Sequence, residues 1–181
     1  TIETKARPQR GYFVSGKVGS TVGNLLSSAS MQMVKADAAY YYTPEKKKYG
    51  TFIVRGQGGL VNVSDEMNAP QSLLFRTGGA NSVRGYEYES IGIRGYDDAV
   101  VGGKVMAAAS LEYQLPIKQD YALAVFHDMG GVSNSIGDFT IKHGTGIGGR
   151  WFSPFAPIAF DLAYGHDDQK IRWYIGLGTQ F

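Results

Sequence analysis

The 181-residue chain contains no cysteine, which excludes a disulfide framework. It has no signal peptide and no apolar run near the roughly 18 residues that a membrane-spanning helix needs. Its formal net charge of +2 is close to neutral and gives no support for a nucleic-acid-binding surface, so no nucleic-acid partner is expected. None of these absences excludes a membrane β-barrel, because each barrel strand crosses with only about 9–11 alternating residues.

Motifs for catalysis are also absent. The three histidines, His127, His143 and His166, do not stand in a ligand spacing such as H-E-x-x-H. No Ser–His–Asp order is identifiable, and apart from glycines there is no phosphate-binding loop. The run His166-Asp167-Asp168 could bind a cation, but a solvated turn is the simpler interpretation. We therefore expect no enzyme, no cofactor and no metal.

The chain does have abundant glycine (25) and tyrosine (12), and apolar residues at every second position over eight segments. Period-two alternation predicts strands with one apolar and one polar face. The expected strands are residues 11–18, 31–42, 49–61, 103–115, 121–130, 141–152, 158–164 and 171–181. Short turns at residues 43–48, 116–120 and 153–157 alternate with longer connections.

Two all-β architectures fit this pattern. An outer-membrane barrel turns its apolar face to lipid and carries aromatic girdles at its rims. A soluble β-sandwich or a lipocalin-like barrel turns the apolar face inward. Long strands, glycines on the polar face and aromatic residues near strand ends favour the membrane barrel; these aromatics are Tyr40, Tyr42, Tyr113, Tyr121, Trp151, Tyr164, Trp173 and Phe181.

The longest non-repetitive segment, residues 64–99, interrupts the strands and carries Val83, Arg84, Gly85 and Tyr86 after a Gly-Gly pair. By itself Arg84 could be an ordinary solvated loop arginine. A second Arg-Gly-Tyr begins at Arg94, but it lacks the preceding Gly-Gly and is followed by two aspartates.

Four motifs occur in a fixed order along the chain. They are Gly78–Tyr86, Phe126-His127-Asp128-Met129-Gly130, Gly146–Pro154, and the ending Trp173–Phe181. Together they resemble the BamA/TamA superfamily of outer-membrane assembly barrels, a bacterial surface antigen family. The turn at residues 153–157 and the ending at residues 174–178 are most similar to the TamA branch, the barrel subunits of the translocation and assembly module.

The resemblance implies a transmembrane antiparallel barrel of sixteen strands, preceded by POTRA domains. Residues 1–181 would then be the C-terminal eight strands with the long sixth extracellular loop, without the POTRA domains and the first half of the barrel. The implied function is insertion or translocation of outer-membrane proteins, such as autotransporters, through a lateral seam in the bacterial outer membrane. The implied partners are the lipid bilayer, client outer-membrane proteins and an inner-membrane-anchored partner. The alternatives are a small eight-stranded structural or adhesive outer-membrane barrel, and a soluble ligand-binding barrel.

The resemblance also implies a site. The loop would fold into the lumen and Arg84 would contact Asp128, with Phe126, Gly130 and Arg150 beside them. The alternation agrees for Asp128, since Tyr121, Leu123 and Val125 occupy the opposite face. The alternative is an Asp that caps a turn at the end of the strand.

Glycines and the last strand complete the predicted set. Gly144, Gly146 and Gly148 share the luminal face, which indicates close approach of another segment or barrel curvature. The last strand, with its outward side chains Trp173, Ile175, Leu177 and Phe181, would direct insertion and form the seam, or be an ordinary edge strand. A closed eight-stranded barrel is filled by its own side chains. The chain would therefore either close as eight strands, with the loop displaced and Arg84 away from Asp128, or join a second copy as a homodimer of sixteen strands with both loops inside. We favour the homodimer.

Overall fold

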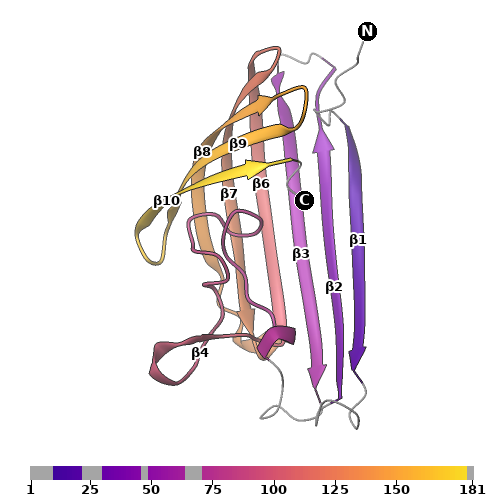
Figure 1. Ribbon diagram of the computed structural model, residues 1–181, viewed down its shortest axis with the longest axis vertical. Coiled ribbons are helices and arrows are strands. Elements are labelled where there is room, and N and C mark those ends of the chain that lie inside the picture. Colours follow the sequence, from indigo (N-terminus) through magenta and orange to yellow (C-terminus); the bar gives the residue numbers. More distant parts are fainter. Residues whose placement is uncertain (1–9, 22–29, 46–48, 64–70, 179–181) are drawn as a thin grey trace.

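The computed structural model describes residues 10–21, 30–45, 49–63 and 71–178. They form one eight-stranded antiparallel sheet in the order β1-β2-β3-β6-β7-β8-β9-β10 (Figure 1). The strands are β1 Arg10–Thr21, β2 Met31–Tyr42, β3 Thr51–Val63, β6 Val105–Lys118, β7 Tyr121–Ser133, β8 Lys142–Phe152, β9 Pro157–Gly165 and β10 Lys170–Leu177. The all-β prediction with eight antiparallel strands is therefore confirmed.

Several predicted boundaries shift. Strand β6 continues through Pro116 to Lys118 with a register irregularity, so the predicted turn at residues 116–120 shrinks. Strand β7 extends to Ser133, because Val105 of β6 still pairs with that residue where a loop was expected. Residues 46–48 of the turn predicted at residues 43–48, and residues 179–181 at the end of the predicted last strand, lie outside the described part of the chain.

The two faces of the sheet differ in composition. Along β7, Leu123 and Val125 are 53% and 52% exposed, whereas their neighbours Ala122 and Ala124 are 2% exposed. The large apolar side chains thus lie on the outer, uncovered face, and the polar face is covered by another part of the chain. The soluble-barrel alternative is wrong, because it requires the apolar face inside.

The sheet curls, so that β10 crosses in front of β6 in Figure 1. Among the described residues, β1 and β10 each pair with one neighbour, so the sheet remains open. No described helix is long and apolar enough to span a membrane.

The folded-back loop, residues 71–104, crosses in front of the sheet in Figure 1, and its part around residues 93–101 projects beyond the side of the strands. It contains the short helix η2 Gln71–Leu73, the strand β4 Ile93–Arg94, the helix η3 Tyr96–Asp98 and the strand β5 Val100–Val101. Another short helix, η4 Ile136–Asp138, connects β7 to β8. The small β4–β5 hairpin was not expected from the sequence, because two residues per strand carry no period.

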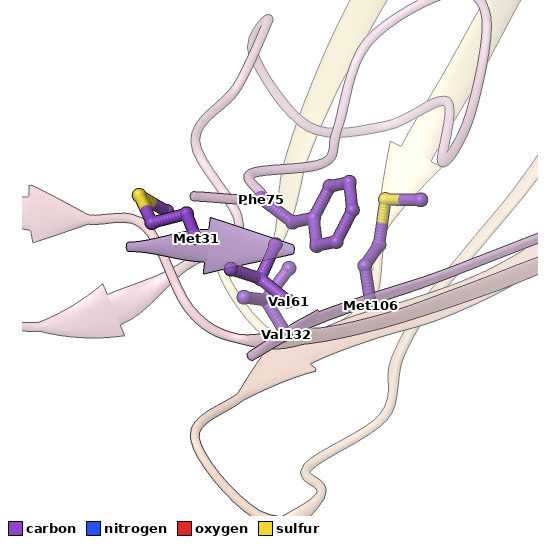
Figure 2. Packing of buried hydrophobic residues seen from close by; sticks show 5 residues of the cluster. All are labelled: Met31, Val61, Phe75, Met106 and Val132. Atoms are coloured by element: carbon purple, nitrogen blue, oxygen red, sulfur yellow. The ribbon is translucent and has the colours of Figure 1, made fainter. Parts of the chain in front are cut away.

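An apolar anchor holds the start of the loop. The ring of Phe75 packs with Met31, Val61, Met106 and Val132, one side chain from each of four strands (Figure 2). The backbone of Phe75 also exchanges hydrogen bonds with Gly103 at 2.9 and 2.8 Å. Opposite the ring lies Gly59, where a Cβ would come within 2.5 Å of Phe75. The loop therefore leaves and rejoins the sheet at one packed point.

Candidate functional site

Arg84 lies at the far end of the folded-back loop and is 1% exposed. Its Nε and Nη2 donate to the two carboxylate oxygens of Asp128 at 2.7 and 2.9 Å, a bidentate, charge-assisted pair. The backbone N–H of Arg84 donates to the same carboxylate at 3.0 Å. Asp128 and Val83 are fully buried, and Tyr86, on the other side of the Arg-Gly pair, is 4% exposed. The predicted loop signature and its predicted strand partner thus form one contact.

Two further carboxylates approach the same guanidinium. Nη1 of Arg84 donates to Glu112 at 2.9 Å and to Asp161 at 3.0 Å. The guanidinium carbon lies 3.4 Å from the centroid of the Phe126 ring, so the planar cation stacks on that ring. Arginine suits this position because its fork offers several donors in fixed directions and a flat face for stacking.

Two further arginines balance the charge. Arg150 donates to Glu112 at 2.9 Å and also to Asp161, and Arg55 donates to Glu112 at 3.2 Å. Three cations therefore meet three carboxylates. A buried charge is tolerated only when it is paired and hydrogen-bonded, and this network meets both conditions.

The strands bring these groups together through register. Ser110 pairs with Asp128, Glu112 with Phe126, and Gly148 with Asp161. Because side chains alternate across a strand, the members of each pair point to the same face. The network of Arg55, Arg84, Glu112, Asp128, Arg150 and Asp161 thus links β3, β6, β7, β8 and β9 to the loop. We call these six residues the charge network.

The electrostatics of Arg84 follow from its surroundings. Burial by itself lowers the pKa of this guanidinium. The hydrogen bond and charge of Asp128, with the charges of Glu112 and Asp161, outweigh burial and raise the pKa above its usual value. Arg84 is therefore held as a cation.

The three predicted glycines serve different neighbours. At Gly144 a Cβ would lie within 2 Å of the Arg84 carbonyl oxygen, so here the loop itself passes close. At Gly146 the Phe126 ring fills the space, and at Gly148 the Asp161 carboxylate does. Close approach therefore applies to all three, but the loop is the neighbour only at Gly144.

A second contact joins the loop to the last hairpin. The Tyr86 hydroxyl donates to the Asp167 carboxylate at 2.6 Å and to the His143 carbonyl at 3.0 Å. The Tyr174 hydroxyl accepts from the Gly85 N–H at 2.9 Å and donates to the Tyr86 carbonyl at 2.8 Å. Burial, followed by the hydrogen bond to Asp167, raises the pKa of Tyr86 to about 12. The same hydrogen bond lowers the pKa of Asp167.

Glycine is required where these segments touch. Gly85 has φ +102°, a conformation that other residues rarely adopt. A Cβ there would also lie 2.8 Å from the Gly165 nitrogen. The Gly85 carbonyl accepts from Arg172 at 2.6 Å.

The remaining residues that the sequence singled out fall into four groups. Gly130 lies beneath Val83, where a Cβ would come within 2.9 Å of the Val83 side chain. Trp173, Ile175 and Leu177 are 66%, 60% and 75% exposed on the outer face. Phe181 lies outside the described residues. Arg94, of the second Arg-Gly-Tyr, donates only to the nearby Asp98 carbonyl in an exposed position and does not enter the charge network.

Sequence reasoning missed four participants: Glu112, Asp161, Arg55 and Tyr174. Each lies on the polar face by alternation, and Asp161 stands alone among apolar neighbours. A lone mid-strand carboxylate on the luminal face was the available signal, since such a charge needs a partner.

One geometric expectation is wrong. We expected that one copy could not place Arg84 on Asp128. The open sheet of a single chain leaves its concave face free, so the loop lies there and the contact forms without a second copy.

Comparisons with known proteins agree with this architecture. A model described as the Omp85 superfamily domain matches residues 1–181. The outer membrane protein assembly factor BamA of Nitratidesulfovibrio vulgaris strain Hildenborough is 29% identical over 184 residues, which cover 94% of this chain. The crystal structure of Haemophilus ducreyi BamA lacking POTRA domains 1–3 superposes with a TM-score of 0.66 at 19% identity and covers 91% of this chain. At that identity the superposition shows the fold alone.

The chain spans less than half the length of the relatives that it matches. This chain covers 22% of the curated BamA relative and 41% of the solved BamA chain. Both proteins are BamA, whereas the turn and the ending suggested the TamA branch, so the comparisons support the superfamily but not that branch.

Proposed function

Because the chain belongs to the Omp85 superfamily, we propose that it is the loop-bearing part of a barrel that assembles other outer-membrane proteins. The curated relative is named as an outer membrane protein assembly factor. The observation that carries the proposal is the buried Arg84, held by three carboxylates from β6, β7 and β9.

The proposed role of this contact is a latch. The loop crosses the concave face and, beyond its apolar anchor at Phe75, is tied to the wall at two further places, the charge network and the last hairpin. A buried cation surrounded by carboxylates has few alternative positions, because leaving any of these charges unpaired is costly. The latch therefore keeps the loop inside and the wall of β6 to β9 in one shape while β10 remains available at the edge.

The mechanism is physical. In this proposal a client strand pairs with an open edge of the sheet, since an unpaired edge presents free N–H and C=O groups. Clients are outer-membrane proteins such as autotransporters, inserted through the lateral seam that the β10 edge would form. Residues Trp173, Ile175 and Leu177 would face lipid beside the entering strand.

The proposal places residues 1–181 as the last eight strands of a sixteen-stranded barrel, with POTRA domains and the other strands in the same full-length protein. The proposal is that the full-length protein is a BamA-type assembly factor. A more specific proposal is that it belongs to the TamA branch and has an inner-membrane-anchored partner, which the turn at residues 153–157 and the ending at residues 174–178 support. Copurification of an inner-membrane protein with the full-length protein tests that more specific proposal.

The latch is tested by a double-mutant cycle in the full-length protein. Arg84→Ala and Asp128→Ala should each slow insertion of a β-barrel client into vesicles, and the double variant should be no slower than the worse single variant. Arg94→Ala is the matched control, because that arginine is exposed and should leave the rate unchanged. Additive defects would remove the latch from the mechanism.

A further inference from the structure

All three histidines of the chain meet on the outer face. His127 comes from β7, His143 from β8 and His166 from the turn after β9. The register brings His127 opposite Thr145. The backbone N–H of His166 donates to the backbone carbonyl of His143 at 3.0 Å. The sequence does not reveal that the three histidines are close, because only the pairing of β7, β8 and β9 places them side by side.

The ring nitrogens form a chain of contacts. Nε2 of His127 lies 3.4 Å from Nδ1 of His143. Nδ1 of His127 and Nε2 of His166 each lie 2.9 Å from the Thr145 hydroxyl oxygen. The His127 ring centroid is 5.5 Å from that of His143 and 6.2 Å from that of His166. One hydroxyl therefore holds two of the three rings in place.

The 3.4 Å contact between these two nitrogens is a long hydrogen bond, and the same separation would fit two ligands of one metal ion. Two imidazole nitrogens bound to one tetrahedral zinc at about 2.0–2.1 Å stand about 3.3–3.4 Å apart. As they are placed, no three or more His, Cys, Asp or Glu side chains among the described residues could together hold a metal ion. His166 would join the pair by rotating away from Thr145, and its ring is exposed enough to do so.

Nearby charges do not compete for the site. Asp167 is occupied by Tyr86 and by Lys142, and Asp168 by Arg172 at 2.7 Å. The ligand set is thus imidazole only, which suits zinc, nickel and copper rather than calcium or magnesium.

We propose that His127, His143 and His166 form a binding site for a divalent transition-metal ion on the outer face of the barrel. The ion would join β7, β8 and β9 at the level where the folded-back loop docks, because the His143 carbonyl also accepts from Tyr86. The site does not depend on the proposed assembly function.

The test is zinc binding by the full chain, folded in detergent and prepared without a polyhistidine tag. Calorimetry with Zn²⁺ alone should show one ion per chain, and zinc should raise the melting temperature. His127→Ala, His143→Ala and His166→Ala should each weaken binding about tenfold or more. Thr145→Ala is the matched control, because it removes both hydroxyl contacts but no ligand and should bind zinc at least as tightly.

Two results would overturn the site. One is no zinc binding by the folded wild-type chain. The other is wild-type affinity in His127→Ala or His143→Ala. If His166→Ala alone binds like the wild type, the three-ligand form is wrong. Binding should also weaken as the pH falls below neutral, because only neutral imidazole coordinates a metal.

Discussion

At the scale of single residues, Arg84 and Tyr86 hold the loop through two different kinds of contact. Arg84 is a buried cation whose donors are satisfied by charged acceptors on three strands. Tyr86 is a neutral group whose hydroxyl joins the loop to the turn after β9. Breaking the Arg84 contact would leave a buried charge unpaired, whereas the Tyr86 contact is lost when the hydroxyl loses its proton at high pH.

The raised pKa of Tyr86 predicts a pH dependence. Because the phenol pKa rises from 10.0 to about 12 on folding, its contribution to stability is full below pH 10 and is lost between about pH 10 and 12. Protection of the loop against a protease active at high pH should fall across this window. The Tyr86→Phe variant should be cleaved faster at neutral pH and should lack the step. A step of equal size in that variant would assign it to another group.

At the scale of elements, β8 is shaped to let the loop approach. Its luminal glycines leave room for a backbone carbonyl, an aromatic ring and a carboxylate in turn. A larger side chain at Gly144 would separate the loop from the wall, whereas at Gly146 or Gly148 it would collide with the Phe126 ring or the Asp161 carboxylate. The composition of β8 is therefore explained by what crosses it rather than by strand propensity.

Gly144→Ala tests this directly. The added methyl group would meet the Arg84 carbonyl, a backbone atom that cannot rotate away, so the loop should be displaced. We expect faster proteolysis of the loop and a loss of client insertion comparable to that of Arg84→Ala. Gly149→Ala is the matched control on the same strand, because nothing lies within 4 Å of a Cβ there. Equal behaviour of the two variants would contradict close approach as the reason for Gly144.

At the scale of the whole molecule, the sheet has two edges, β1 and β10, each paired on one side in the described structure. Unpaired backbone groups in hydrocarbon cost several kcal/mol each, so lipid-exposed edges must find partners. In the full-length protein other strands of the barrel would supply them. In this chain alone, a second copy could.

The chain alone is therefore expected to form a homodimer of sixteen strands in detergent. Native mass measurement should give twice the chain mass. With one cysteine added at each edge, Val14→Cys and Ile175→Cys, a short thiol crosslinker should join two chains. The chain has no other cysteine, so every crosslink reports these edges. A monomer crosslinked within itself would mean closure with eight strands.

Local pattern was sufficient for much of this structure. Alternation of side chains determined the number of strands, their approximate bounds and the face to which Asp128 belongs, because strand periodicity is a property of neighbouring residues. It also placed Arg84 on a segment that could not be a strand. The bounds failed at Pro116 and Ser133, where pairing with the neighbouring strand extends β6 and β7.

Only the tertiary structure decided which groups meet. That Glu112 and Asp161 share the Arg84 guanidinium, and that His127, His143 and His166 lie together, depends on strand register and on the path of the loop. These contacts join residues far apart in sequence, and no local pattern carries them. The amino-acid sequence by itself therefore determined the faces of the sheet, whereas the curl of the open sheet and the docking of the loop determined the partners on them.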